Sequence, residues 1–461
     1  MSAFLDKIFV VLAKICRDDE EAVTQSVKEC LAVVGYYADP TTILASLLPM
    51  VAGRMAGQDT AQHRTNGLVL LGMSIGGMTT QTIASRLEAI LDALCDSGVR
   101  ESEAADLQEQ LAFVVLTVIN TAGAALQTND DASFRLFWLI SHLLAAAPED
   151  SIANETATEC LAALATMSFI SVFWAVFLNV CRFLRKPNSA WKKSHASRVL
   201  FDSVCRRAGA ACGENMTTLV PVFLLHLDVS QDADVRLAFL ALLETMLGND
   251  AVCQAFKPFN TQLLLKAIMP NIVWHGGRVA ATIRKVAVAC AYTLLRQGLA
   301  DQPCLFEAAP QMLPVLKSCL DDGDAKTRQL VCLALQYLFV ALPGCLGEEP
   351  VHQLYAEILK RLDDSNDIVR RAACQTFKTF LRAAPKSHFR GTIIDYTLDC
   401  LFVHLDDADP TIQEAVMEVI LETVNIDALL LAKKAQENRS RHQSPKFCDQ
   451  LLAAATSHTE E

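Results

Sequence analysis

Carboxylates and guanidinium groups recur at a fixed spacing in the C-terminal half of this sequence. Asp322 lies six residues before Arg328, and Asp364 lies six residues before Arg370. A carboxylate pair such as Asp363-Asp364 has the chemistry to move protons or to hold a cation. However, these aspartates follow apolar runs at points where one helix is expected to end and the next to begin, and a carboxylate there caps free backbone N–H groups. We therefore interpret them as helix caps and not as an acid/base pair or a cation site.

No other motif predicts catalysis. Gly72-Met-Ser-Ile-Gly76-Gly77 lacks the lysine of a phosphate-binding loop and the spacing of a dinucleotide-binding turn, so close helix packing or a helix end explains it better. The sequence contains no Gly-x-Ser-x-Gly or His-Glu-x-x-His motif, and its ten histidines are scattered. His226 and His404 precede similar Leu-Asp turns, which is typical of partly exposed helix ends. The sequence thus predicts a protein that is not an enzyme, with no catalytic residue, no cofactor and no metal site.

The acidic and basic residues belong to a longer repeat. One position, which we call the anchor, recurs at intervals of 48, 44, 42 and 43 residues, and Arg64 is an earlier, weaker copy. Apolar residues follow the anchors at offsets of two, three and seven, which places one apolar stripe along a helix. This period predicts an all-α, right-handed α-solenoid of about ten HEAT-like or armadillo-like helix pairs. The five anchors are Arg236, Arg284, Arg328, Arg370 and Gln413.

Three segments resemble the HEAT motif closely, with a Leu-Asp-Asp turn before the anchor. They begin at Leu316, Leu359 and Leu401, and Asp409-Pro410 in the last one predicts a helix cap followed by proline at the first helical position. In HEAT proteins, the aspartates and arginines of neighbouring repeats form a ladder along the stack. The resemblance implies such a ladder here, with a neutral and weaker rung at Gln413. Its expected members are Asp322, Arg328, Asp364, Arg370, Asp407 and Gln413.

We expect one continuous solenoid over residues 1–425, clearest over 215–425, and a C-terminal helix with a polar tail over 426–461. No Gly/Ser linker divides the chain, although its length alone would allow about three domains. Sixteen cysteines without a Cys-x-x-Cys pair are typical of small buried side chains in a reducing compartment. No secretory signal is evident, which favours the cytoplasm. Apolar periodicity alone predicts weaker second helices near residues 103–127 and 152–166.

Residues 161–181 carry no charge, and Arg182, Arg185 and Lys186 follow at once. This length suffices to span a bilayer with its positive flank in the cytoplasm. Polar residues interrupt the apolar run, however, and two shorter buried helices joined near 167–168 explain it equally well. We expect no membrane span, and the segment remains ambiguous from sequence.

Residues 182–207 carry eight basic side chains and one acidic side chain. A solvated face of a helix pair explains such a run. The alternative is a binding site for an acidic partner, because a tryptophan beside cations is typical of binding hot spots. The net charge of −12 disfavours nucleic acid as the partner. The candidate partner-binding residues are Trp191, Lys192, Lys193, Arg198, Arg206 and Arg207.

The sequence from about residue 222 to 451 resembles the HEAT-repeat factor needed for cytoplasmic preassembly of axonemal dynein arms. The resemblance is carried by residues 360–367, by the turn at 403–407 and by the tail at 441–452. The first 200 residues resemble that family only in general character. Its members are longer chains, which leaves open whether N-terminal repeats are missing here.

This resemblance implies a non-enzymatic scaffold or co-chaperone needed for motile cilia. It would act in the cytoplasm, with axonemal dynein chains and other assembly factors as its protein partners. The alternative is a karyopherin-like transport carrier or a phosphatase-type scaffold that uses the same solenoid surface. An enzyme is the third possibility, and no motif supports it.

Overall fold

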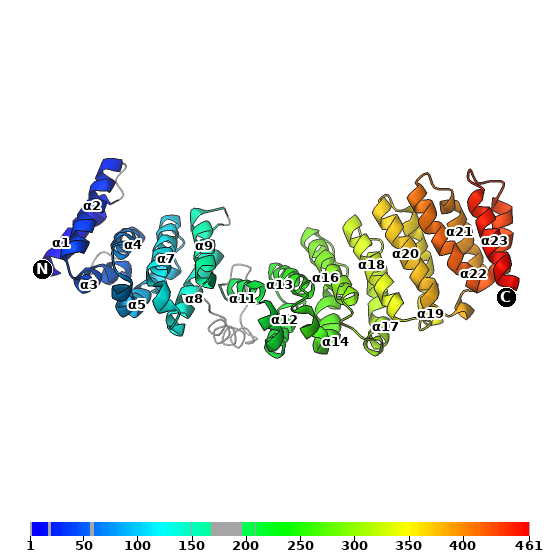
Figure 1. The fold of residues 1–461 in the computed structure, drawn as a ribbon, viewed down its shortest axis with the longest axis horizontal. Coiled ribbons are helices and arrows are strands. Elements are labelled where there is room, and N and C mark those ends of the chain that lie inside the picture. Colours follow the sequence, from blue (N-terminus) through cyan, green and yellow to red (C-terminus); the bar gives the residue numbers. More distant parts are fainter. Residues whose placement is uncertain are drawn as a thin grey trace. The chain divides into compact units, whose positions relative to one another are not determined.

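The computed structural model describes residues 2–16, 20–55, 60–148, 150–166, 196–207 and 209–460. Within these ranges all regular structure is helical and no strand occurs. The chain divides into two compact units, Met1–Ala208 and Gly209–Glu461. Inside each unit, helix pairs stack so that first helices form one layer and second helices the other (Figure 1). The predicted all-α solenoid class is thereby confirmed.

In the unit Met1–Ala208, the second helices α4, α7 and α9 lie side by side, and the first helices α3, α5 and α8 cover them. Helices α7 and α9 lie where apolar periodicity predicted second helices. The bounds are α1 Ser2–Ile15, α2 Glu21–Tyr37, α3 Pro40–Val51, α4 Ala61–Gly76, α5 Thr80–Leu94, α6 Ser97–Arg100, α7 Ala105–Leu126, α8 Asp130–Ala146, α9 Ile152–Thr166 and α11 Ala196–Arg207.

In the unit Gly209–Glu461, the second helices α13, α16, α18, α20 and α22 pack in chain order, each on the next (Figure 1). The bounds are η1 Gly209–Asn215, α12 Met216–His226, α13 Ala233–Leu247, η2 Cys253–Phe259, α14 Asn260–Gln262, η3 Leu263–Ile268, α15 Met269–Ile272, α16 Arg278–Arg296, α17 Gln302–Cys319, α18 Ala325–Ala341, α19 Glu348–Leu359, η4 Lys360–Asp363, α20 Asp367–Ala383, η5 Lys386–His388, α21 Thr392–Leu405, α22 Pro410–Asn438 and α23 Lys446–Glu460.

Short polar side chains begin many of these helices, as the sequence predicts. Asp409 accepts a hydrogen bond from the Thr411 N–H, and Pro410 occupies the first helical position of α22. Each cap satisfies a backbone donor that the helix leaves free, which is worth about 1 kcal/mol. The other side chains that cap in this way include Thr60, Thr79, Asn129, Asp232, Asp301, Asp324 and Asn366.

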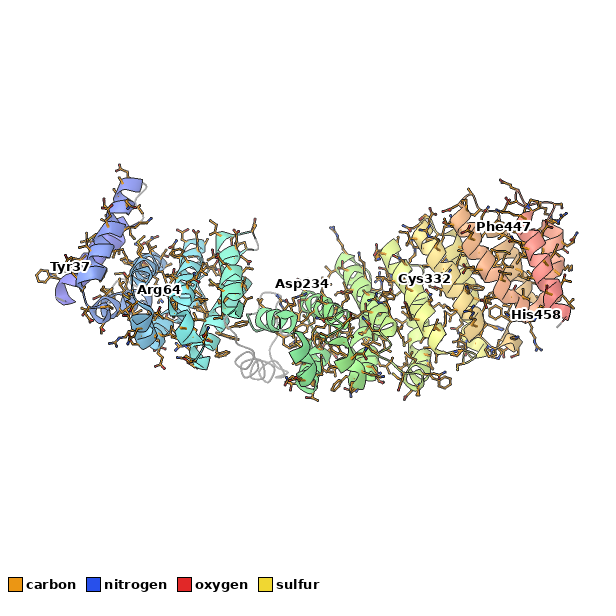
Figure 2. The ribbon with its side chains drawn as sticks, in the orientation of Figure 1. Tyr37, Arg64, Asp234, Cys332, Phe447 and His458 are labelled. Carbon is orange, nitrogen blue, oxygen red and sulfur yellow. The ribbon has the colours of Figure 1, made fainter. Side chains whose placement is uncertain are left out.

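The apolar stripe that follows each anchor forms the core of the unit Gly209–Glu461. At offset seven, Leu243, Leu335 and Phe377 are fully buried. Cys332, labelled in Figure 2, and Cys374 lie buried four residues after their anchors. Burial raises the pKa of both thiols to about 12. These two cysteines therefore pack as small apolar side chains, with their sulfur in the unreactive thiol form.

Helix α7 is long and apolar enough to cross a membrane by length and composition alone, and no other helix in the described ranges passes that test. It packs against α4, α5, α8 and α9. One face of α7 lines the core of the unit, with Leu107, Leu111, Val118 and Leu126 buried, whereas Phe113 on another face is 51% exposed. Of the segment 161–181, residues 167–181 lie outside the described residues.

The last repeat passes into two C-terminal helical segments that pack on it. Helix α22 is broken at Asp427, whose φ of −152° and ψ of 84° are not helical. The Asp427 side chain accepts a hydrogen bond from the Leu430 N–H and so caps the second part of the helix. Helix α23 packs on α22, and Arg439 Nε lies 2.5 Å from Asp449 Oδ1. The predicted continuity of the solenoid over 1–425 passes through residues 167–195, outside the described residues, and stays a prediction.

Candidate protein-binding surface and the interrepeat ladder

Arginines on successive second helices reach the turn of the following repeat. Arg284 on α16 lies 2.5 Å from Asp322, measured from Nη2 to Oδ2. Arg328 on α18 binds Asp364 through two parallel hydrogen bonds, of 2.6 Å from Nε and 2.7 Å from Nη2. Such forked pairs are the strongest guanidinium–carboxylate geometry. Arg370 on α20 pairs with Asp407 through Nη2 alone, so the charged members of the expected ladder lie together.

Each rung also fixes the turn in which its aspartate lies. Asp322 Oδ1 accepts a hydrogen bond from the backbone N–H two residues later, at 2.9 Å, and Asp364 does the same at 3.0 Å. Arg328 Nη1 donates to the carbonyl of Asp322 at 2.8 Å, and Arg370 Nε donates to that of Leu362 at 3.0 Å. One arginine therefore ties its own turn to the next, which holds consecutive repeats in register.

The guanidinium–carboxylate pair is absent from the rungs at both ends of this series. Arg236 Nη1 donates to Asn271 Oδ1 at 2.9 Å, so an amide replaces the carboxylate. Gln413 Nε2 donates to the carbonyl of Asp407 at 2.6 Å, within its own repeat. The predicted ladder does not include Arg284. Its position as an anchor, equivalent to those of Arg328 and Arg370, could have predicted its role.

A further rung lies in the unit Met1–Ala208. Arg64 on α4 pairs with Asp96 at 2.9 Å, and Asp96 accepts a hydrogen bond from the Gly98 N–H (Figure 2 labels Arg64). Sequence reasoning identified Arg64 as an anchor but missed Asp96, because no Leu-Asp-Asp turn marks that repeat. The glycine motif is also structural: a Cβ at Gly72 would lie 3.2 Å from Val114 of α7, so glycine there permits close helix packing.

Burial of the rungs falls toward the C-terminus. The side chains of Arg284 and Asp322 are 4% and 3% exposed, whereas those of Arg370 and Asp407 are 17% and 15% exposed. Burial would raise the pKa of Asp364, but hydrogen bonds from Arg328 and from the Asn366 N–H outweigh it, and the pKa lies below its ordinary value. The Asp364 carboxylate therefore acts as a permanent acceptor, not as a proton carrier at neutral pH.

Only part of the predicted basic site lies in the described residues. Trp191, Lys192 and Lys193 fall outside them, and of Arg207 only the backbone, at the end of α11, is described. Arg206 pairs with Asp202 at 2.8 Å on the same helix. Arg198 is half-buried, and burial lowers its pKa. An acidic partner for this segment stays a prediction.

A second candidate surface runs along the second helices of the unit Gly209–Glu461. Positions one, five, eight and twelve after each anchor share the outer side of these helices, because these offsets follow the helical period. We call them the outward stripe. The stripe on α16 contains Lys285, Ala289, Tyr292 and Arg296, and that on α18 contains Gln329, Leu333, Gln336 and Val340.

The outward stripe changes character along the unit. Between α16 and α18, Tyr292 and Tyr337 lie with ring centroids 5.9 Å apart, and Val340 is 60% exposed. Between α20 and α22, Lys378 pairs with Glu418 at 2.9 Å and Arg382 pairs with Glu422. The α16–α18 part therefore presents aromatic and apolar surface with few charges, which is typical of protein-binding sites.

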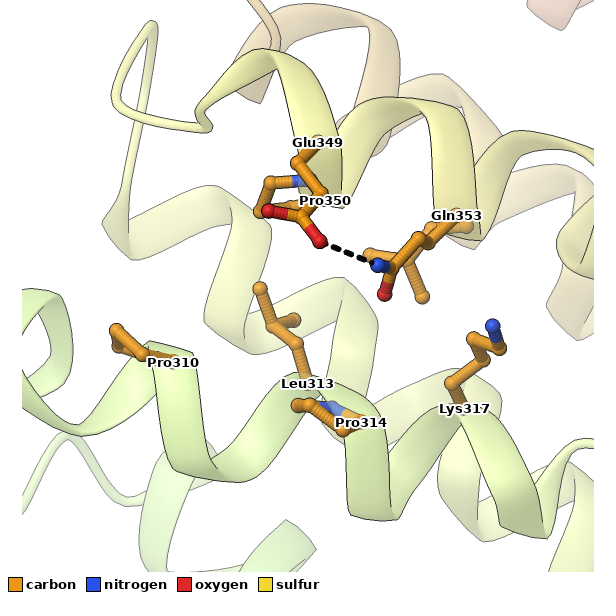
Figure 3. A pocket seen from close by; sticks show the side chains of 8 residues that line it. Pro310, Leu313, Pro314, Lys317, Glu349, Pro350 and Gln353 are labelled. Carbon is orange, nitrogen blue, oxygen red and sulfur yellow. Dashed lines mark hydrogen bonds between the residues drawn. The ribbon is translucent and has the colours of Figure 1, made fainter.

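The first-helix layer has a shallow hollow between α17 and α19, of about 200 Å³ (Figure 3). Pro310, Pro314 and Pro350 line it together with two leucines, and Lys317 lies at the rim. On the α19 side of the hollow, Glu349 accepts a hydrogen bond of 2.9 Å from Gln353, one turn along the same helix. This hollow is smaller than typical ligand pockets. Within the described ranges, no group of three His, Cys, Asp or Glu side chains is placed to hold a metal ion.

Comparison with known proteins finds similarity to proteins named for dynein assembly. Residues 1–146 match the family described as dynein axonemal assembly factor 5, HEAT-repeat domain. The human protein named dynein axonemal assembly factor 5 is 26% identical over 464 residues, covering 97% of this chain and 52% of its own length. The Xenopus laevis protein of the same name is 23% identical, with 97% and 53% covered. The chain spans about half the length of these curated relatives.

Solved structures with a similar fold include the karyopherin Kap121p bound to Nup53p, at 10% identity and a TM-score of 0.47, covering 95% of this chain and 47% of that one. A designed armadillo repeat protein covers 51% of this chain and 98% of its own, at 15% identity and a TM-score of 0.38.

The expected resemblance to the dynein assembly family is confirmed, but its predicted extent was too narrow. The N-terminal region had been expected to resemble the family only in general character, yet residues 1–146 match its HEAT-repeat domain. The Leu-Asp-Asp turns that carry the later resemblance are missing from residues 1–146, so the sequence pattern did not indicate this match. The chain is an α-helical repeat protein that is similar over nearly its whole length to proteins named dynein axonemal assembly factor 5.

Proposed function

We propose that this protein is a non-enzymatic scaffold for the preassembly of axonemal dynein arms, acting in the cytoplasm. The observation that carries the proposal is the similarity over 97% of the chain to proteins named for that role. Its partners would then be axonemal dynein chains and other assembly factors. A stack of helix pairs suits such a role, because it offers a long, shallow surface to a large client.

The outward stripe of α16 and α18 is the part of the described surface best suited to hold the client. Tyr292 and Tyr337 are half-buried, so their rings are pre-positioned and lose little conformational freedom on binding. Arg296 lies 5.6 Å from the Tyr292 ring centroid and adds a cation at the edge of the apolar patch. The ladder keeps α16 and α18 in register, so the two tyrosines remain a single patch.

The test is depletion of the protein from ciliating cells, followed by replacement with variants. We expect depleted cells to build axonemes that lack dynein heavy chain by immunofluorescence, while axonemal tubulin is unchanged. A Tyr292→Ala/Tyr337→Ala variant should restore less axonemal dynein than the wild type and should co-purify less heavy chain from cytoplasm.

The matched control is Tyr355→Ala/Tyr396→Ala, which removes a comparable ring pair, 6.4 Å apart, from the first-helix layer. This control should rescue as well as the wild type does. Normal axonemal dynein in depleted cells would overturn the assembly role. If both double variants rescue equally, the assembly role stands, but the client binds a surface other than that of Tyr292 and Tyr337.

A further inference from the structure

The turn between α15 and α16 departs from the other turns of its unit. Helices α13, α18, α20 and α22 begin three residues before their anchors, whereas α16 begins at Arg278, six residues before Arg284. The three additional residues lengthen the helix by about 4.5 Å. Residues 273–279, which we call the extended turn, are all exposed. Gly277 has a φ of +106°, which L side chains rarely adopt, so glycine permits this path.

The extended turn presents a tryptophan to solvent. Trp274 is 60% exposed, and Val273 and Val279 beside it are 43% and 48% exposed. The guanidinium carbon of Arg284 lies 6.0 Å from the Trp274 ring centroid. Because Arg284 is itself held by Asp322, the ring rests on a fixed support. An ordered, exposed tryptophan of this kind is the residue type most enriched in binding hot spots.

The neighbouring turn places negative charge next to this tryptophan. Asn271, three residues before Trp274, donates a hydrogen bond of 2.7 Å to the carbonyl of Leu227, so residues 227–232 adjoin the extended turn. Val229 there is 53% exposed. The exposed carboxylates of this turn and of the start of α13 form no ion pair with a cation of the described residues. They belong to Asp228, Asp232 and Asp234.

Carboxylates on the other side of the extended turn are already neutralised. Asp321 pairs with Lys360 at 2.6 Å and also with Arg361, and Asp324 lies 3.5 Å from Lys285. Three exposed carboxylates and one guanidinium, that of Arg236, which donates to the Gln231 carbonyl at 3.1 Å, therefore leave an excess of negative charge in the turn next to Asn271 (Figure 2 labels Asp234). Such an arrangement favours an occupant with positive charge beside an apolar side chain.

We propose that the extended turn binds a flexible basic segment of a partner protein. An apolar side chain of that segment covers Trp274 and Val229, and flanking lysines or arginines pair with Asp228, Asp232 and Asp234. The same carboxylates repel nucleic-acid phosphates and anionic membrane surfaces, which leaves a basic polypeptide as the favoured occupant. This inference goes beyond the proposed function and does not depend on it.

The experiment measures the fluorescence anisotropy of a labelled twelve-residue peptide that alternates lysine and leucine, titrated with the full chain at physiological salt. We expect Trp274→Ala to weaken binding at least tenfold. Asp228→Asn/Asp232→Asn/Asp234→Asn should weaken it to a similar extent, and asparagine keeps the helix cap at position 232. Trp274→Phe should retain most of the affinity, because the ring is preserved.

The matched controls lie in the first-helix layer of the same unit. Phe306→Ala removes a ring that is 59% exposed, and Glu307→Gln/Glu348→Gln/Glu349→Gln removes three exposed charges. Both should bind within twofold of the wild type. Equal weakening by the two charge variants would reveal general attraction to an acidic protein and overturn the proposal. Unchanged binding by Trp274→Ala would also overturn the proposal. Tighter binding of a peptide that alternates glutamate and leucine would overturn it too. If the chain self-associates and Trp274→Ala abolishes that self-association, the extended turn binds a second copy of the chain, which would also overturn the proposal.

Discussion

The middle and the C-terminal end of the unit Gly209–Glu461 share one architecture but use charge in opposite ways. In the middle, Arg284 and Asp322 are buried as a pair, and Tyr292 of the outward stripe lies beside Tyr337 of α18. At the end, the rung of Arg370 is partly exposed, and the outward stripe carries ion pairs between α20 and α22. Charge is thus placed inside the stack in the middle and on its surface at the end.

This difference separates the tasks of the two regions. A buried ion pair makes the register of the repeats strict, since a displaced register would leave charges without partners in a poorly solvated place. Surface ion pairs contribute little to stability, but they cover the second helices with groups that already satisfy one another. The middle therefore leaves aromatic and apolar surface with few charges for a partner, and the end does not.

Substitutions in the core should lower the free energy of unfolding most, and by a similar amount in both regions. Phe377→Ala at the end and Leu335→Ala in the middle should each cost about 3–5 kcal/mol, because both side chains are fully buried. Phe377 also packs against Phe380, with ring centroids 5.6 Å apart. Hydrogen exchange should show loosened neighbouring repeats and unchanged protection in distant ones. An even loss of protection over the whole unit would show that it unfolds as one globule.

The loss of unfolding free energy on removing a ladder arginine should differ between the two regions more than the loss on removing a core side chain does. Arg284→Ala should cost about 3–5 kcal/mol, since it leaves the buried Asp322 carboxylate without its cation. Arg370→Ala should cost only about 0.5–2 kcal/mol, because water can reach Asp407. Urea unfolding of both variants measures the difference. The double variant Arg284→Ala/Asp322→Ala should recover part of the loss, and equal costs for the two single variants would remove the distinction between the regions.

Surface pairs at the end should contribute least to stability. Lys378→Ala and Arg382→Ala should each cost about 0.2–1 kcal/mol and less at high salt, since their partners Glu418 and Glu422 are accessible to water. Thermal melts at two salt concentrations test this. A cost that salt does not change would indicate that Lys378 acts through packing of its aliphatic chain.

Acid should weaken the ladder through its carboxylates. The folded-state pKa of Asp364 is lowered, so its contribution is complete above the unfolded-state pKa, about 4, and is lost as the pH falls through the lower folded value. Asp364→Asn should therefore lose less stability than the wild type between neutral and strongly acidic pH. The midpoints of urea unfolding across that pH range measure this loss of stability. Parallel curves for the two proteins would contradict a lowered folded-state pKa for Asp364.

Much of the ladder could be predicted because its residues repeat at a local spacing. Asp364 and Arg370 are six residues apart on the same turn, so the sequence shows both, and capping chemistry explains why the aspartate is there. Asp96 and Asn271 could not be predicted, because no repeated Leu-Asp-Asp turn marks them. The exposed Trp274 was missed for a related reason: its repeat lacks the Leu-Asp-Asp turn that would have aligned it with the others.

The sequence by itself determined the helical class, the period and the buried stripe, because these depend on local propensity and on the spacing of apolar residues along each helix. Only the tertiary structure decided which arginine reaches which carboxylate, and how deeply each pair is buried. It also decided that α16 begins one turn early, which exposes Trp274 beside unpaired carboxylates. Burial and charge pairing arise between repeats, where packing across the stack and not position in the chain sets the distances.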